Sequence, residues 1–352
     1  MSAVRDTVNR STLILACLAV LLAVGLWYPP APPPNPKIIP GGDIVLFRAV
    51  VERMRAGEPY YGTMRDELRQ RGYPTASIFN WRPPATFLLM ARVPGVVHTL
   101  MFVLGLMAVL GTSHVFSATS MAARLLAIFL VLGSAVLPFL PVDGLYLPEL
   151  WAGIFLLLSV IAYSVGAIRL AVCCAVAAAC ARELAMPYVL VSLALAVRER
   201  RTQEIRWYAA GLTIFAAYYI AHIAVARTHI QPGDMSHTHS WVAFGGWPFV
   251  VSTTALGGWH ILFPRWTGAI GAVLVVASLW SSADRHLKIM AVLYLSLFCV
   301  VGQAFNNSWG LLTGPVWGLA TAYGVLGLQR LVRSAALQAM SSKTTSSHTD
   351  FA

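Results

Sequence analysis

The chain has 352 residues, of which 58% are hydrophobic and only 11% are charged, and its formal net charge is +11. Soluble domains carry about 25% charged residues, so this composition excludes an ordinary water-soluble enzyme, and several apolar runs approach the roughly 20 residues that a helix needs to cross a bilayer. The predicted fold class is an all-α polytopic membrane protein. An excess of lysine and arginine on cytoplasmic loops accounts for the positive charge, and no nucleic-acid partner is indicated.

About ten membrane-spanning helices are predicted. The first, residues 12–28, is interpreted as an uncleaved anchor, because "WYPPAPPPNP" follows it where a signal peptide would have a small-residue cleavage site. The later spans are predicted at residues 95–117, 122–140, 146–166, 169–182, 184–197, 206–226, 259–280, 287–304 and 310–329. All five cysteines lie inside apolar runs, without disulfide or metal-ligand spacing.

The stretch 169–197 resembles one long span, but Arg182 and Glu183 interrupt it. Both Arg169 and "RERR" at 198–201 belong on the cytoplasmic side by the positive-inside rule. Two short helices joined by an outer tip at Arg182–Glu183 are therefore predicted, since one helix would leave both charges at the centre of the bilayer. The simplest role for these two charges is mutual neutralisation at the break.

The predicted layout is a single transmembrane domain, residues 1–333, with both ends of the chain in the cytoplasm. A serine- and threonine-rich cytoplasmic tail, residues 334–352, is expected to be disordered. The first extracytoplasmic loop, residues 29–84, is the exception to the charge rule. Its arginines, which suggest an anionic partner such as a lipid headgroup or phosphate, are Arg48, Arg53, Arg55, Arg65, Arg69, Arg71 and Arg82.

An amphipathic helix is predicted within this loop, over residues 43–56, after two glycines and before Gly57. Its apolar row, by the i, i+3, i+4, i+7 rule, consists of Phe47, Val50, Val51 and Met54. Asp43 lies four residues before Phe47 and continues this row, so its carboxylate should point towards the protein. It would cap the helix, face a substrate pocket, or do both.

The order of segments here is a hydrophobic anchor, an acidic residue, an amphipathic helix that ends in G-x-P-Y, a polar segment, and an aromatic P-P entry into the next span. With Asp43, "EPYY" (58–61) and "FNWRPP" (79–84) in these places, the chain resembles the GT-C superfamily of integral-membrane glycosyltransferases, especially bacterial branches that use polyprenyl-phosphate mannose or arabinose. Three later segments occupy fitting places, which extends the resemblance over most of the chain through short motifs: "LPELWAGIFLLLSVIAY" (147–163), "ARELAMPYVLVSLALAVRERR" (181–201) and "WGLLTGPVWGLA" (309–320).

The resemblance implies a multi-pass enzyme of the inner (plasma) membrane. It would transfer a sugar, with inversion, from a polyprenyl-phosphate donor to a hydroxyl of a glycan, lipid or protein acceptor on the extracytoplasmic side. Asp43 would be the base, and Arg82 and Arg182 would bind the leaving phosphate, because the planar fork of arginine matches phosphate oxygens. The matched segments supply further candidates for substrate or phosphate binding: Tyr60, Tyr61, Asn80 and Trp81.

The chain departs from the family in its carboxylates. Many relatives have two acids close together in the first loop, consistent with a metal, whereas "GGDI" supplies one. The candidates for a second carboxylate are Asp143, Glu149 and Glu183. No cofactor is assigned: a divalent metal stays an open alternative that no residue pattern supports. The H-x-H of "DMSHTHSW" (234–241) is better interpreted as a solvated loop.

Two functions of other classes remain open. A membrane transporter or a translocase of lipid-linked substrates, without transferase activity, would use a broken, charged helix such as that at residues 182–183. No internal repeat supports this alternative, and an elaborate outer loop has no evident role in transport. The third class is a catalytically silent membrane scaffold.

Overall fold

The computed structural model describes residues 10–27, 42–236, 242–302 and 304–349. Over these residues the chain is helical apart from turns, loops and one isolated antiparallel bridge between Val242 and Val301, which confirms the all-α prediction. The α-helices are α1 (Arg10–Trp27), α2 (Gly42–Arg55), α3 (Tyr60–Gln70), α4 (Ala85–Arg92), α5 (Pro94–Val115), α6 (Met121–Ala135), α7 (Pro148–Ser164), α8 (Ile168–Ala181), α9 (Met186–Arg198), α10 (Thr202–His229), α11 (Gly246–Thr254), α12 (Thr267–Ala277), α13 (Arg285–Val300) and α14 (Gly310–Thr349).

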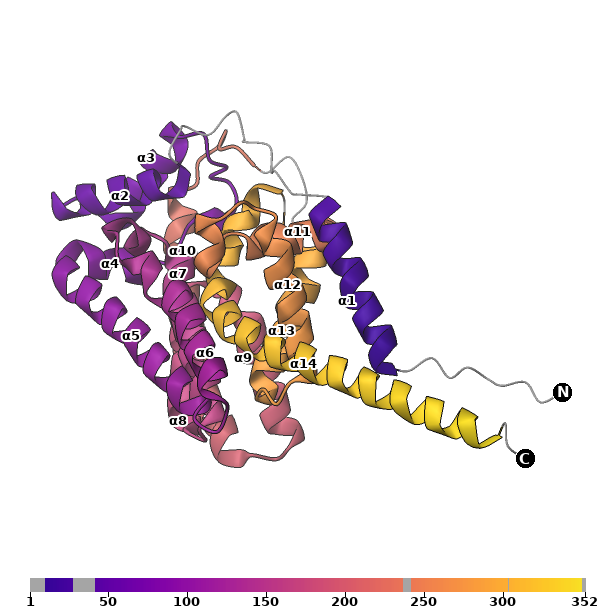
Figure 1. Cartoon of the computed structure of the whole chain (residues 1–352). Helices are drawn as coiled ribbons and strands as arrows, with labels where there is room; N and C mark the ends of the chain where they lie inside the picture. Colours follow the sequence, from indigo (N-terminus) through magenta and orange to yellow (C-terminus); the bar gives the residue numbers. More distant parts are fainter. Residues whose placement is uncertain (1–9, 28–41, 237–241, 303, 350–352) are drawn as a thin grey trace.

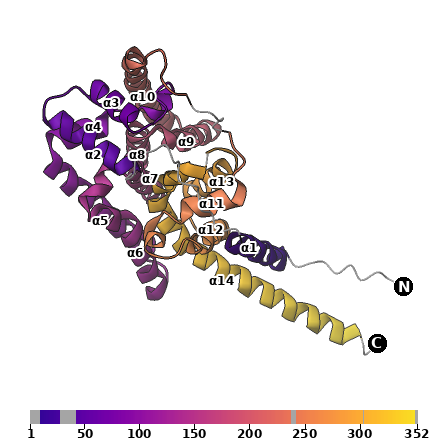
Figure 2. The ribbon, with the colours of Figure 1, turned by 90° about the horizontal axis from the view of Figure 1, so that it is seen from above.

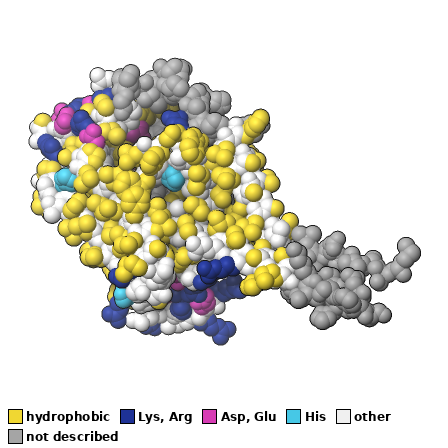
Figure 3. All heavy atoms as spheres, in the orientation of Figure 1, with side chains coloured by type: hydrophobic (Ala, Val, Ile, Leu, Met, Phe, Trp, Pro, Cys, Tyr) yellow, Lys and Arg dark blue, Asp and Glu magenta, His cyan; other side chains and the backbone are white. Residues whose placement is uncertain are grey.

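The surface and the helix lengths indicate a helical membrane protein. Among the described residues, five segments are long and apolar enough to cross a bilayer: α1, α5, α10, the run Met121–Phe139 that contains α6, and the run Phe305–Met340, which begins in a 3-10 helix and continues into α14. Shorter apolar helices pack among them, including α7 and α8. Figure 3 shows a broad hydrophobic belt between two ends that carry the charged side chains. Each predicted span overlaps a helix, while the count of ten crossings stays a prediction.

Helix α7 forms the centre of the fold, and nearly every residue along it is buried. It packs against α5, α8 and α14, which surround it. The contact with α14 requires a glycine at position 153, because a Cβ there would lie 2.7 Å from the carbonyl oxygen of Leu312. Small residues allow such close helix contacts in membranes, where packing rather than the hydrophobic effect drives association.

The helix break at Arg182–Glu183 is confirmed. Helix α8 ends at Ala181, a 3-10 turn covers Glu183–Ala185, and α9 begins at Met186. The first turns of α8 and α10 line one cavity, and α9 ends directly before α10 begins. The start of α8 and the end of α9 therefore lie at the same end of the molecule, so the two helices run in opposite directions. The break is linked to the first loop through Glu149, which lies within ion-pair distance of both Arg182 and Arg82.

Three segments differ from the sequence-based expectations. Helix α11, within what was expected to be an outer loop, was not predicted, because nine residues between glycine-rich turns give too short a periodic signal. The predicted span 259–280 becomes helical only at Thr267, after a 3-10 helix over Gly258–Leu262. The tail that was expected to be disordered, residues 334–352, is helical as far as Thr349, where α14 ends, because "SAALQAM" (334–340) is rich in good helix formers. Residues 350–352 lie outside the described residues.

Helices α2, α3 and α4 cover one end of the molecule, on the side away from α1 and the projecting end of α14 (Figures 1 and 2). The predicted helix at 43–56 is α2, and its apolar face is buried as expected at Phe47, Val50 and Val51, with Leu46 added and Met54 partly buried. It ends before Gly57, whose φ of 97° is in the left-handed region that favours glycine. The amphipathic helix therefore packs on the protein.

The charged ends allow a direct test of the predicted layout. In a cysteine-free background, single cysteines at Asp66, on α3, and Gln203, on α10, should react with a membrane-impermeant maleimide from opposite sides of the membrane. Labelling in intact cells and in inverted vesicles measures this. Reaction of both positions from the same side would contradict the layout.

Candidate functional site

Five charged side chains from distant parts of the sequence meet at the end covered by α2 and α3. We call them the arginine–carboxylate cluster: Asp43, Arg82, Glu149, Arg182 and Glu183. They come from the first turn of α2, the segment before α4, the first turn of α7, and the break between α8 and α9. Three carboxylates and two guanidinium groups leave a formal charge of −1, so the charges are almost balanced within the cluster.

Arg182 lies at the buried end of the cluster. Its Nε donates to Glu149 Oε1 at 2.8 Å, and its Nη1 donates to Glu183 Oε1. The side chains of Arg182 and Glu149 are each 3% exposed. Because both hydrogen-bonding edges of this guanidinium are committed to protein carboxylates, Arg182 positions Glu149 and is not free to hold a ligand without rearrangement.

Arg82 has donors to spare. Its Nη2 lies 3.8 Å from Asp43 Oδ2 and 3.7 Å from Glu149 Oε1, distances too long for hydrogen bonds. Its Nη1 donates to the carbonyl of Phe79 at 3.1 Å, and its buried Nε has no hydrogen-bond partner. With a 13% exposed side chain, Arg82 is a partly accessible guanidinium held between two carboxylates that it does not fully engage.

Asp43 is the most accessible carboxylate of the cluster, with 26% of its side chain exposed. The helix begins one residue earlier, at Gly42, so Asp43 lies within the first turn of α2. Its Oδ1 accepts a hydrogen bond of 2.7 Å from the Tyr73 hydroxyl. Burial and the neighbouring charge of Asp43 raise the pKa of Tyr73, which keeps this hydroxyl protonated as a donor. Oδ2 is left facing Arg82.

The backbone around Arg82 is fixed by aromatic and histidine side chains. The Tyr60 hydroxyl donates to the Arg82 carbonyl, and His222 Nε2 lies 3.0 Å from the Trp81 carbonyl. A carbonyl can only accept, so Nε2 carries the proton and Nδ1 accepts from the Tyr61 hydroxyl at 3.2 Å. These bonds fix the carbonyls of Trp81 and Arg82, and so they fix the backbone from which the Arg82 side chain extends.

The remaining predicted binding residues also contact this segment. The Trp81 indole donates to the Thr75 carbonyl at 2.9 Å, and the Asn80 amide donates to the Pro74 carbonyl. Trp81 is 2% exposed, so in this structure it supports the fold of the loop. Direct contact of Tyr60, Tyr61, Asn80 or Trp81 with a substrate stays a prediction.

The candidates for a second carboxylate separate into two groups. Glu149 and Glu183 belong to the cluster, whereas Asp143 pairs with Arg48 on the surface. Within the described parts of the chain no group of three or more metal-ligating side chains is found, and His237 and His239 lie outside the described residues. A divalent cation shared by Asp43 and Glu149 would have to displace the Arg82 guanidinium from between them, so these donors do not fit a metal.

Two residues that support the cluster were not among the predicted site residues. Tyr73 and His222 bond to Asp43 and to the Arg82 segment, but a tyrosine in a loop and a histidine in an apolar helix are individually unremarkable. The polarity of His222 within a membrane span predicts internal hydrogen bonds, and the structure confirms them with Tyr61 and the Trp81 carbonyl. That these bonds support the Arg82 segment was not predicted.

The loop 230–236 is fastened to the first loop beside this site. Arg69 donates from Nε and Nη2 to the two carboxylate oxygens of Asp234 at 2.8 and 2.9 Å, and Ala76 N–H donates to the Met235 carbonyl. The hydrogen bond from Arg69 lowers the pKa of Asp234 from 3.8 to about 2.

This shift predicts an acid-dependent loss of stability. Since the folded-state pKa is lowered, the stabilisation is complete above about pH 4 and is lost as the pH falls towards 2. Asp234→Asn should remove that acid-dependent step and cost about 1 kcal/mol at neutral pH. Thermal unfolding in detergent between pH 6 and pH 2.5 measures both. Asp143→Asn, in an exposed ion pair, is the control; the same acid step in Asp234→Asn as in the wild type would contradict the assignment.

Comparison of the chain with protein-family models, with curated proteins and with solved structures finds no match. The features that indicate a function lie in the cluster itself: one accessible carboxylate, one guanidinium with unfilled donors, and a buried ion pair that fixes both relative to the helices.

Proposed function

We propose that the protein is a membrane glycosyltransferase of GT-C type. It would move a sugar from a polyprenyl-phosphate donor to an acceptor hydroxyl of a glycan, lipid or protein on the extracytoplasmic side of the inner membrane. The observation that carries the proposal is the juxtaposition of Asp43, 26% exposed, with an Arg82 guanidinium whose Nε and Nη2 are not engaged in hydrogen bonds.

The proposed reaction uses one carboxylate. Asp43 accepts the proton of the acceptor hydroxyl while that oxygen attacks the anomeric carbon of the donor sugar. The bond between this carbon and the phosphate oxygen breaks, and the lipid phosphate leaves with the electron pair and an additional negative charge. Arg82 stabilises that charge through its free N–H groups. Attack from the face opposite the phosphate inverts the anomeric configuration.

The arrangement of the other residues supports this division of roles. Glu149 is 3% exposed and accepts from the buried Arg182. Glu183 accepts from Arg182 through Oε1, and its Oε2 is buried without a partner. Asp43, at 26% exposed, is therefore the most accessible base of the three. Tyr73 donates to Oδ1 of Asp43, which leaves Oδ2 as the atom that takes the proton. Oδ2 lies 3.8 Å from Arg82 Nη2. Because in-line attack places the acceptor oxygen and the departing phosphate on opposite faces of the sugar, the donor sugar has to bind between these two side chains and move them apart.

Substitution of Arg82 tests the proposal. In liposomes supplied with polyprenyl-phosphate sugars, Arg82→Gln should lower the transfer rate by about 10²- to 10³-fold, as expected for loss of one group that stabilises developing charge. Arg82→Lys should keep part of the activity, because the charge remains while the planar fork is lost. Arg92→Gln, at the exposed end of α4, is the matched control. Full activity in Arg82→Gln would contradict the proposal.

One feature favours a second candidate, a translocase of lipid-linked substrates. Two short helices, α8 and α9, meet at a charged break, as in several transporters. The same liposomes distinguish the two functions, because a translocase would move the polyprenyl-phosphate sugar between leaflets without forming a glycosylated acceptor.

A further inference from the structure

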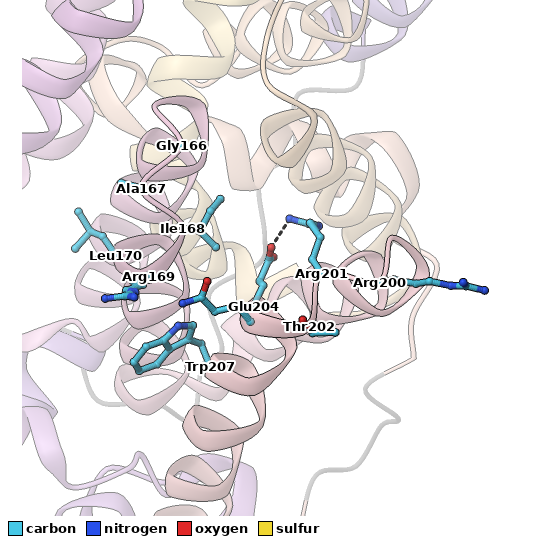
Figure 4. Close-up of a pocket in the computed structure, with 11 residues that line it drawn as sticks. Gly166, Ala167, Ile168, Arg169, Leu170, Arg200, Arg201, Thr202, Glu204 and Trp207 are labelled. Atoms are coloured by element: carbon cyan, nitrogen blue, oxygen red, sulfur yellow. Dashed lines mark hydrogen bonds and ion pairs between the residues drawn. The ribbon is translucent and has the colours of Figure 1, made fainter.

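A cavity of about 750 Å³ lies at the opposite end of α8 from the arginine–carboxylate cluster. Its walls are the first turns of α8 and α10 and the turn that precedes α10 (Figure 4). The cluster lies beyond the last residue of α8, Ala181, and 14 helical residues separate the two sites by about 20 Å. The cavity is therefore not part of the proposed catalytic site.

The cavity carries positive charge that its own carboxylate does not neutralise. Its lining includes Arg169, Arg200 and Arg201 against one acid, Glu204. Glu204 accepts hydrogen bonds from Arg201 and from the buried Tyr163 hydroxyl, and its ion pair is with Arg201 rather than with Arg169. Figure 4 shows Arg200 pointing away from Arg169, which leaves Arg169 as the principal cation of the site.

Backbone donors add to this field. Arg169 and Leu170 are in the first turn of α8, and Gln203 and Glu204 are in the first turn of α10. The N–H groups of a first turn have no acceptor within their own helix, and the helix dipole adds partial positive charge there. Two helix N-termini and an arginine thus converge on one cavity, an arrangement that suits phosphate.

Exposed apolar side chains lie directly beside Arg169. Leu170 is 52% exposed and Trp207 is 40% exposed, and the Arg169 guanidinium lies 5.5 Å from the centre of the Trp207 ring. Amphipathic tryptophan and arginine pairs are typical of the boundary between the hydrocarbon core and the headgroups. In Figure 3 the basic end of the molecule adjoins the hydrophobic belt, so a ligand at this boundary can contact both charged and apolar side chains.

We infer that this cavity binds the phosphate headgroup of an anionic phospholipid, with Arg169 and the N-termini of α8 and α10 on the phosphate and Leu170 and Trp207 along the start of the acyl chains. Basic pockets between membrane helices on the cytoplasmic side are suited to such headgroups. A free phosphate ion would contact Arg169 and the helix N-termini but not Leu170 and Trp207. A lipid contacts both groups and is therefore the better fit.

The test uses the full-length protein in detergent micelles and compares binding of phosphatidylglycerol and phosphatidylcholine by native mass spectrometry. The wild type should retain phosphatidylglycerol preferentially. Arg169→Gln should weaken its binding by about fivefold, the value for one arginine near an anionic surface, while Arg169→Lys keeps most of it. Arg206→Gln, an exposed arginine on α10 outside the cavity, is the matched control.

A second variant keeps the test decisive if Arg169→Gln does not fold. Gln203→Glu adds a negative charge inside the cavity, yet a glutamate in the first turn of α10 should stabilise that helix, so the protein should fold and bind phosphatidylglycerol less tightly. Unchanged binding in a folded cavity variant, or equal weakening by Arg206→Gln, would overturn the inference. Full displacement of the lipid by 10 mM sodium phosphate would also overturn it, in favour of a site for the free ion.

Discussion

Asp43→Asn is expected to lower the rate of sugar transfer by about 10²- to 10⁴-fold, the usual cost of losing a general base. Asparagine has nearly the same size, and its amide oxygen can still accept the hydrogen bond that the Tyr73 hydroxyl donates to Oδ1. It cannot take a proton from an acceptor hydroxyl. Membrane insertion and the thermal unfolding midpoint should therefore change little, while transfer from a polyprenyl-phosphate sugar in liposomes is lost.

The matched control is Asp143→Asn, the same change at the same end of the molecule. Asp143 pairs with Arg48 at the surface and has a 48% exposed side chain, so its loss should leave transfer unchanged. Full activity of a well-folded Asp43→Asn protein would reject Asp43 as the base. Loss of folding in that variant would instead assign it a purely structural role at the start of α2.

Arg182→Met should cause the largest loss of stability among single substitutions in the cluster, about 3–5 kcal/mol. The guanidinium is 3% exposed and neutralises Glu149, also 3% exposed, and Glu183. Methionine fills much of the same volume but leaves these carboxylates buried without their partner, and Arg82, at 3.7 Å from Glu149, compensates only in part. Reversible unfolding in mixed micelles measures the change in free energy.

A double substitution shows how much of the lost stability comes from lost packing and how much from a buried carboxylate without its partner. Arg182→Met combined with Glu149→Gln removes the main uncompensated charge, so it should recover a substantial part of the stability lost in Arg182→Met alone. Arg285→Met is the control, because Arg285 is 43% exposed in its pair with Glu199 and exposed pairs contribute about 1 kcal/mol or less. A change of less than about 1 kcal/mol in Arg182→Met would contradict a structural role for the buried pair.

Much of the fold follows from local properties of the sequence. Composition and long apolar runs identify a helical membrane protein, since only a helix satisfies its own backbone in lipid over such lengths. The break at Arg182–Glu183 was readable because two adjacent charges cannot lie at the centre of one membrane helix. The burial of the α2 face that contains Phe47 and Val50 was readable from its helical period.

The tertiary structure alone decided which charges meet. Asp143 and Glu149 lie six residues apart in "PVDGLYLPEL" (141–150), and the sequence offers both as a second carboxylate. A 3-10 helix leaves Asp143 facing Arg48 at the surface, while the first turn of α7 directs Glu149 inward to Arg182, 33 residues further along the chain. Local periodicity sets the direction of a side chain on its own helix, but its partner depends on how distant helices pack, and no local signal encodes that.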